Sequence, residues 1–130
     1  MKNRVTGIGG VFFTSENPQK LKEWYKERLG LPVDQYGCSF KWRPENDPEK
    51  IAMTQWSPFE AKTSYFEPST KNFMLNYRVE NLVELLKILK EEGVTIVGEM
   101  EEYEYGKFGW IMDPEGNKIE LWEPIDEPLL

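Results

Sequence analysis

The sequence predicts an α+β domain that spans residues 1–130 and contains two βαβββ modules, one at about residues 1–60 and one at about residues 70–125. Three observations carry this prediction: two segments with helical periodicity, the same capping pattern around both helices, and strand-like runs before and after each helix. A chain of 130 residues has the usual length of one domain. Neither half would bury much core alone, which favours a single domain over two.

The first predicted helix begins after Asn17, whose side chain suits the N-cap, and Pro18 suits the first helical position. Apolar residues then recur at the helical spacing i, i+3 and i+4, as Leu21, Trp24 and Tyr25. Gly30 fits the left-handed residue that commonly ends a helix. We therefore expect a helix between Asn17 and Gly30.

The second predicted helix repeats this pattern with Asn81 as N-cap, Glu84 as the capping-box acid and Gly93 as the stop. Its apolar stripe consists of Leu82, Leu85, Leu86 and Leu89. The two caps are 64 residues apart and the two glycines are 63 residues apart. The alternative, two unrelated helices with ordinary caps, does not account for this near-equal spacing, so we interpret the pattern as an internal duplication.

Short runs that are apolar, or that alternate between apolar and polar residues, lie before each helix cap and at several places after each helix-ending glycine. These predicted strands are residues 10–14, 31–33, 40–43 and 51–56 in the first half, and 74–78, 94–97, 108–112 and 118–122 in the second. The segment 113–117 predicts a hairpin turn, since its proline and glycine occupy the second and fourth positions. We interpret the polar segment 57–71 as the connection between the modules.

Composition excludes several classes of function. The net charge of −7 argues against nucleic-acid binding, and the absence of histidine excludes Ser-His-Asp triads and zinc sites with imidazole ligands. Cys38, the sole cysteine, has no intrachain disulfide partner and favours a reducing, cytoplasmic location. The N-terminal residues are a poor signal peptide, and no apolar run approaches the roughly 18 residues of a membrane helix. We therefore expect no membrane contact.

Strand alternation separates two faces of the predicted sheet. The uniformly apolar set, which includes Val11, Leu75 and Leu121, should lie under the helices. The opposite, concave face then carries aromatic walls and polar anchors: Phe12, Met74, Asn76, Arg78, Glu120 and Trp122. Such a mixture is typical of a small-molecule pocket. The alternatives are that Phe12 and Met74 fill the core and that Arg78 and Glu120 form a structural ion pair.

Several motifs together resemble the vicinal oxygen chelate superfamily, the group of glyoxalases, bleomycin resistance proteins and ring-cleaving dioxygenases. They are Asn17-Pro18, the helix end 24–31, Tyr77 to Leu82, Tyr105-Gly106 and the segment Asp113 to Leu121, which together cover nearly the whole chain. The resemblance implies two βαβββ modules that form a curved mixed sheet around a cavity, either within one chain or across a homodimer.

In metal-using members of that superfamily, four inward positions on the first and last strands of the modules supply ligands. The resemblance carries these positions onto Gly10, about Thr54, Met74 and Glu120, of which only Glu120 is a strong ligand. One carboxylate cannot hold a hard divalent ion against its hydration shell. We therefore expect no metal and no other cofactor, with a divalent metal as the alternative.

The sequence thus predicts a metal-free, homodimeric protein that binds a small organic molecule in an aromatic cavity, as the metal-free antibiotic-binding relatives do. The predicted ligand-binding residues are Phe12, Asn76, Arg78, Glu120 and Trp122. The 18 aromatic residues and the acidic balance suit a planar or cationic ligand. The alternatives are a metal-dependent lyase, isomerase or dioxygenase, catalysis with Glu120 as general base, and a regulatory module whose own side chains fill the cavity.

Overall fold

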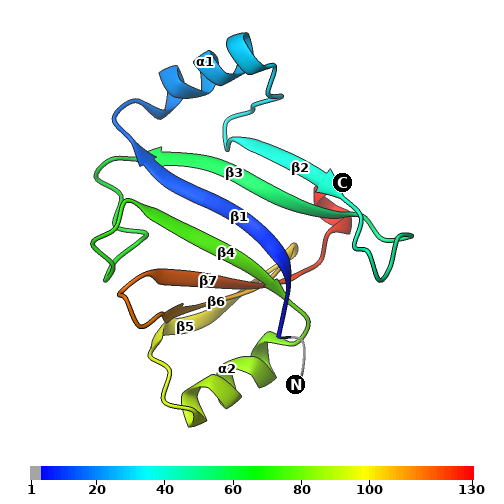
Figure 1. The fold of residues 1–130 in the computed structure, drawn as a ribbon, viewed down its shortest axis with the longest axis vertical. Coiled ribbons are helices and arrows are strands. Elements are labelled where there is room, and N and C mark those ends of the chain that lie inside the picture. Colours follow the sequence, from blue (N-terminus) through cyan, green and yellow to red (C-terminus); the bar gives the residue numbers. More distant parts are fainter. Residues whose placement is uncertain (1–3) are drawn as a thin grey trace.

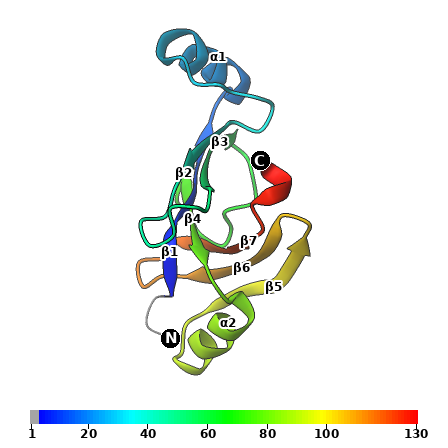
Figure 2. The ribbon, with the colours of Figure 1, turned by 90° about the vertical axis from the view of Figure 1, so that its right-hand side faces the viewer.

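The computed structural model describes residues 4–130, which form one seven-stranded mixed sheet and two α-helices (Figure 1). The elements are β1 (Val5–Ser15), α1 (Pro18–Leu29), β2 (Cys38–Trp42), β3 (Ala52–Glu60), β4 (Phe73–Val79), α2 (Leu82–Glu91), β5 (Ile96–Tyr103), β6 (Gly106–Met112), β7 (Lys118–Pro124) and the short 3-10 helix η1 (Glu127–Leu129). Seen along the sheet in Figure 2, β5, β6 and β7 turn across the direction of β1 and β3, so the sheet is curved. The predicted α+β class and curved mixed sheet are confirmed.

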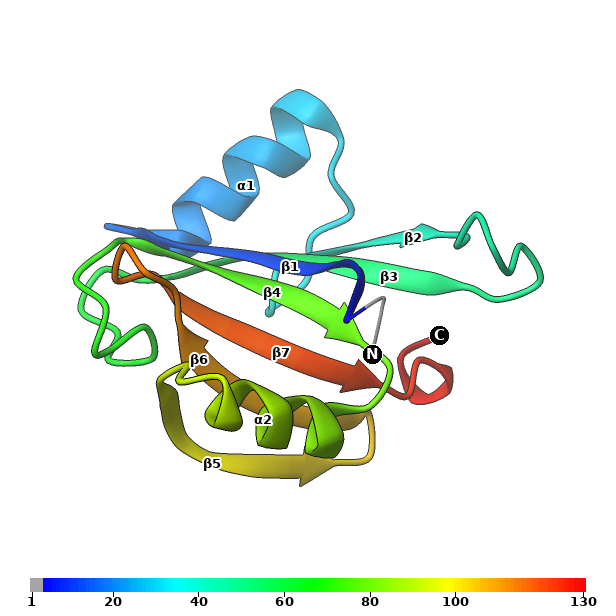
Figure 3. The same ribbon diagram turned by 60° about the horizontal axis from the view of Figure 1, so that its bottom comes forward.

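The sheet order β2-β3-β1-β4-β7-β6-β5 agrees with the internal duplication, because the strands of each module lie together in it. In each module the first and last strands pair in parallel, β1 with β3 and β4 with β7. The modules join edge to edge through the antiparallel pairing of β1 with β4. This pairing makes one continuous sheet with a helix near each end (Figure 3).

The first module has one strand fewer than predicted, because residues 31–33 do not enter the sheet. Pro32 has no amide hydrogen to donate to a neighbouring strand, and the Val33 amide instead bonds to the carbonyl of Leu31 at 2.8 Å. The connection also begins later than expected, since β3 continues to Glu60. Pro58 is tolerated there because β2 pairs only as far as Trp56, which leaves Pro58 with β1 as its one neighbour.

The predicted helix ends are confirmed by their hydrogen bonds. The Asn17 Oδ1 atom accepts the amide of Lys20 at 3.0 Å, and the Asn81 Oδ1 atom accepts the amide of Glu84 at 3.2 Å. Gly30 follows the first helix with φ of 70°, in the left-handed region that favours glycine. Neither helix of the described residues is long and apolar enough to cross a membrane.

The two helices pack on the outer face of the sheet with very different cores. Under α2, the leucine stripe covers the apolar side of β4, β6 and β7, in the cluster Val79, Leu82, Leu85 and Leu121. Under α1, the contact is aromatic and smaller. The ring centroid of Trp56 lies 4.8 Å from that of Tyr25 and 5.4 Å from that of Phe13. Trp24 and Leu29 of α1 remain exposed. The second module therefore holds the main aliphatic core.

The inner face of the sheet carries a second core. Its buried members are Phe12, Met74, Trp110 and Phe66, and the last of these comes from the connection 61–72 rather than from a strand. Phe12 and Met74 therefore fill the core, which was the alternative interpretation of both residues. The connection folds over the inner face and supplies side chains to it.

The α2 core predicts a large difference between two neighbouring substitutions. Leu85→Ala removes a fully buried side chain and should lower the free energy of unfolding by about 2–5 kcal/mol. Val83→Ala, on the exposed side of the same helix, should change it by about 0.5 kcal/mol or less. Urea unfolding of both variants tests this assignment, and equal losses would contradict it.

Candidate functional site

The site is built on a row of residues that crosses the inner face of the sheet. Strand pairing places Gln55, Gly10, Asn76, Glu120 and Trp110 side by side on β3, β1, β4, β7 and β6. Directly paired residues of neighbouring strands point to the same face, so the side chains of this row point inward. The first and last strands of both modules contribute to it, and these are the strands on which the family resemblance places the site.

The register corrects one member of this row. Gln55, and not Thr54, lies opposite Gly10. The Thr54 hydroxyl instead donates to the carbonyl of Ile8 at 2.5 Å and accepts the indole N–H of Trp42 at 2.9 Å.

With the offset of 64 residues, Phe12 corresponds to Asn76. Ser57 pairs with Phe12 and therefore corresponds to Glu120. The alignment of the two modules by their Trp-containing strand ends, which gave about Thr54, was therefore wrong by three residues.

Glu120 lies at the centre of the site and is only 2% exposed. Its Oε1 atom accepts the side-chain amide of Asn76 at 2.7 Å. Its Oε2 atom accepts the indole N–H of Trp110 at 2.9 Å and the hydroxyl of Tyr65. A buried carboxylate is costly unless it is hydrogen-bonded, and here both oxygens are supplied with donors by the chain itself.

Tyr65 was missed in the sequence because it lies in the polar connection 61–72, where no periodicity marks it. Its ring stacks on Phe59 with centroids 5.6 Å apart and meets Trp110 edge-on at 6.3 Å. Burial, the charge of Glu120 and the hydrogen bond to it raise the pKa of the Tyr65 phenol well above its usual value. The phenol therefore remains a donor to Glu120.

Lys118 also contacts Tyr65 and Trp110. Its ammonium group donates to the Tyr65 carbonyl at 2.7 Å and lies 5.4 Å and 5.7 Å from the ring centres of Tyr65 and Trp110. Burial lowers the pKa of Lys118, and the nearby charge of Glu120 opposes that shift. A cation of the chain itself thus lies against the aromatic surface that the sequence suggested for a cationic ligand.

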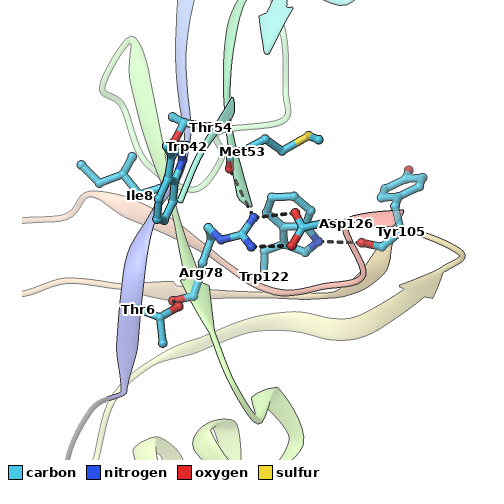
Figure 4. A network of polar contacts seen from close by, with 9 residues as sticks. All are labelled: Thr6, Ile8, Trp42, Met53, Thr54, Arg78, Tyr105, Trp122 and Asp126. Carbon is cyan, nitrogen blue, oxygen red and sulfur yellow. Dashed lines mark hydrogen bonds and ion pairs between the residues drawn. The ribbon is translucent and has the colours of Figure 1, made fainter. Parts of the chain in front are cut away.

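Arg78 forms the second polar centre of the inner face and is 3% exposed (Figure 4). Its two terminal nitrogens donate to the carboxylate of Asp126 at 2.9 Å and 2.6 Å, and one also donates to the carbonyl of Met53 at 3.2 Å. The guanidinium lies 5.5 Å and 5.1 Å from the ring centres of Trp42 and Trp122. The ion pair considered for Arg78 and Glu120 is therefore wrong: the partner of Arg78 is Asp126.

Asn76 connects these two centres along β4. Its amide N–H bonds to Glu120, whereas its Oδ1 atom is buried without a hydrogen-bond partner. Gly9 lies directly against that oxygen, since a Cβ atom at this position would fall 2.2 Å from it. Glycine is thus required at position 9 for Asn76 to keep its place in the row.

The residues at the four family positions do not suit a divalent metal. Gly10 offers no side chain, Met74 is packed in the inner core, and the Thr54 hydroxyl is engaged by the backbone of β1. Glu120 is surrounded by hydrogen atoms of three donors, which would face an incoming cation. In residues 4–130, no three His, Cys, Asp or Glu side chains gather in a way that would hold a metal ion.

Two hollows in the surface lie away from this row. One of about 610 Å³ lies where β1 ends against the connection, beside Thr14, Phe66 and Lys71. The other, of about 510 Å³, lies beside Trp24 and Tyr25 of α1. Neither is lined by Phe12, Asn76, Arg78, Glu120 or Trp122. All five predicted residues are buried. The chain's own Tyr65, Phe66 and Asp126 lie against this group.

Comparison with known proteins agrees with this topology. The family model of the Glyoxalase/Bleomycin resistance protein/Dioxygenase superfamily matches residues 7–121. The chain belongs to this superfamily. No curated protein matches it significantly.

Solved structures with the same fold share little sequence with this superfamily member. Methylmalonyl-CoA epimerase from Mycobacterium tuberculosis is 19% identical, with a TM-score of 0.64 over 99% of this chain and 95% of that one. A Streptomyces coelicolor methylmalonyl-CoA epimerase is 11% identical, with a TM-score of 0.67 over 92% and 98%. A Legionella pneumophila structure named as an NAD-dependent benzaldehyde dehydrogenase is 16% identical, with a TM-score of 0.56 over 89% and 98%. These likenesses establish the fold alone.

The hydrogen bond between Tyr65 and Glu120 predicts a stability difference between two tyrosine variants. Tyr65→Phe removes one donor from a buried carboxylate and should lower the free energy of unfolding by about 1–3 kcal/mol. Tyr103 also donates to a carboxylate, that of Glu101, but at the surface, so Tyr103→Phe should have no measurable effect. Urea unfolding compares the two variants, and indistinguishable curves would contradict the assignment.

The raised pKa of Tyr65 predicts a loss of stability in alkaline solution. In the unfolded chain the phenol has the ordinary tyrosine pKa of about 10, whereas in the folded chain it keeps its proton to higher pH. Its contribution to stability is therefore complete below about pH 10 and decreases as the pH rises above that value. Between about pH 8 and pH 11, the free energy of unfolding should decrease more steeply with pH for the wild type than for Tyr65→Phe. Parallel curves would show that Tyr65 titrates normally.

Proposed function

We propose that this member of the superfamily is a metal-free protein that binds a small organic molecule on the inner face of its sheet, beside Glu120. The observation that carries the proposal is the donor shell of Glu120. Three side-chain N–H and O–H groups supply both of its oxygens, which is the environment of a hydrogen-bond acceptor and not of a metal ligand.

A ligand reaches this position by displacing Tyr65. The Tyr65 hydroxyl meets the buried carboxylate while 38% of the residue remains exposed, so one side chain spans the distance from solvent to Glu120. The strands that carry Asn76, Arg78 and Glu120 lie in the middle of the sheet, whereas Tyr65 belongs to a connection. Loops move at lower free-energy cost than central strands. The connection that carries Tyr65 is therefore the part of the chain that moves when a ligand enters.

The displaced ring indicates the shape of the ligand. Tyr65 presents a planar ring between Phe59 and Trp110, with a hydroxyl donor directed at Glu120. A ligand with an aromatic ring and an N–H or O–H donor replaces each of these contacts. Glu120 then serves as a binding residue, whose Oε2 atom accepts the donor of the ligand in place of the Tyr65 hydroxyl.

The competing function is turnover. Two of the structural neighbours described above are named as methylmalonyl-CoA epimerases, which would predict epimerisation of an acyl-CoA by this chain as well. A metal-dependent lyase, isomerase or dioxygenase is the other enzymatic possibility. Both would use a bound metal or a carboxylate oxygen as base, whereas in the structure N–H and O–H donors of the chain itself supply both oxygens of Glu120.

The homodimer belongs to the same proposal. Ile8 and Val11 of β1 are exposed on the outer side of the sheet, between the areas covered by the two helices. A second copy of the chain would cover such an apolar strip. The cytoplasm remains the expected location, and the buried Cys38 fits a reducing compartment.

Metal analysis and a thermal-shift series test the proposal. Protein purified without chelators should contain less than stoichiometric Mn, Fe, Ni or Zn, and EDTA should leave its melting temperature unchanged. Benzamidine and phenol, which combine a ring with a donor, should raise the melting temperature. A ligand present at a hundred times its Kd adds about 2.7 kcal/mol to the free energy of unfolding. Glu120→Gln should reduce this shift.

Each opposite outcome contradicts the proposal. One equivalent of tightly bound metal, lost in Glu120→Gln, would favour the metal-dependent enzyme. Epimerisation of methylmalonyl-CoA by the metal-free protein would favour catalysis. No shift from benzamidine or phenol would show that Tyr65 is a permanent part of the core, which is the regulatory or structural alternative.

A further inference from the structure

The chain holds the Arg78 guanidinium so that the edge formed by its two terminal nitrogens faces a carboxylate. The guanidinium carbon lies 5.5 Å from the ring centre of Trp42 and 5.1 Å from that of Trp122. The carbonyl of Met53 accepts a further N–H of Arg78 (Figure 4). The edge that faces the carboxylate presents one N–H from each terminal nitrogen. Two parallel N–H donors match the two oxygens of a carboxylate, so this edge is a geometrically specific site.

The present occupant of that edge, Asp126, comes from a weakly attached tail. Of residues 125–130, only Asp126 is buried, while the apolar Ile125 and Leu129 are 51% and 41% exposed. The Ile125 amide bonds to Tyr105, and the later backbone bonds of the tail are internal to it. A segment that docked by packing would bury its apolar residues. This tail is instead anchored mainly by one ion pair.

We propose that Arg78, with Trp42 and Trp122, is a binding site for the carboxylate group of a small organic acid, and that Asp126 is an intramolecular occupant which such a ligand displaces. This inference rests on the proposed function, because it names a ligand class for the same inner face. The tail then lowers the apparent affinity for the ligand, since only molecules with a free Arg78 edge bind it.

The charges of the inner face support an exchange of carboxylates at Arg78. The guanidinium is 3% exposed and needs an anion at all times, so release of Asp126 is favourable only when another anion takes its place. A planar carboxylate reproduces both hydrogen bonds between the two indoles. Tetrahedral phosphate has the charge but not the flat shape, and should bind less well at equal ionic strength.

The test measures benzoate binding by the fluorescence of the neighbouring indoles. Asp126→Ala should bind benzoate at least about tenfold more tightly than the wild type, because the competitor is gone. Glu127→Ala, which removes the adjacent exposed carboxylate of the same tail, is the matched control and should bind like the wild type. Adding Arg78→Lys to Asp126→Ala should abolish the gain, because lysine cannot form the paired hydrogen bonds.

The wild-type protein gives an independent test that does not depend on the folding of Asp126→Ala. The Ile125 amide, which bonds to the Tyr105 carbonyl, should exchange its hydrogen faster in the presence of benzoate than in benzamide or in sodium chloride of the same ionic strength. Equal exchange rates in all three would overturn the inference. Equal benzoate affinity of Asp126→Ala and Glu127→Ala would also overturn it, and tighter binding of inorganic phosphate than of benzoate would overturn the carboxylate assignment.

These outcomes separate the inference from the proposed function. If benzamidine stabilises the wild type through Glu120 but Asp126→Ala gains no benzoate binding, the inference fails and the proposed function stands. If Asp126→Ala gains benzoate binding while no donor-bearing ring stabilises the wild type, the carboxylate site stands and the role of Tyr65 as a displaceable side chain fails.

Discussion

Two ionisable side chains, Glu120 and Arg78, face the apolar inner side of the sheet, and each is almost completely buried. Burying a charge is costly unless hydrogen bonds or an opposite charge compensate for it. Each of the two groups has a partner from outside the sheet. Tyr65 of the connection donates a hydrogen bond to Glu120, and Asp126 of the tail forms an ion pair with Arg78. This requirement explains why two irregular segments fold against the concave face instead of leaving it open.

The duplicated scaffold provides equivalent positions but unequal chemistry. In both modules the first and last strands pair in parallel, so the same inward positions recur on β1 and β4. The second module places Asn76 and Glu120 there, whereas the first places Phe12 and Ser57. The amide and the carboxylate at these positions therefore lie in the second module alone. The sequence does not provide a symmetric set of metal ligands across the module boundary.

Local signals predicted most of the fold and part of the site. Caps, periodicity and alternation located both helices and placed Phe12, Asn76 and Glu120 on the inner face, because each signal acts within a few residues. Thr54 was misplaced because register is set by strand pairing and not by a local motif. The partners Tyr65 and Asp126 are 55 and 48 residues from Glu120 and Arg78, and no local pattern encodes such contacts.

The most direct measurement is a double-mutant cycle of Tyr65→Phe, Glu120→Gln and the combined variant, followed by urea unfolding. If the chain itself supplies the donors of Glu120, the two substitutions should be coupled by about 1.5–3 kcal/mol, the range for a hydrogen bond to a charged group. Additive effects, within about 0.5 kcal/mol, would mean that the carboxylate is held by something other than Tyr65 and would contradict the account.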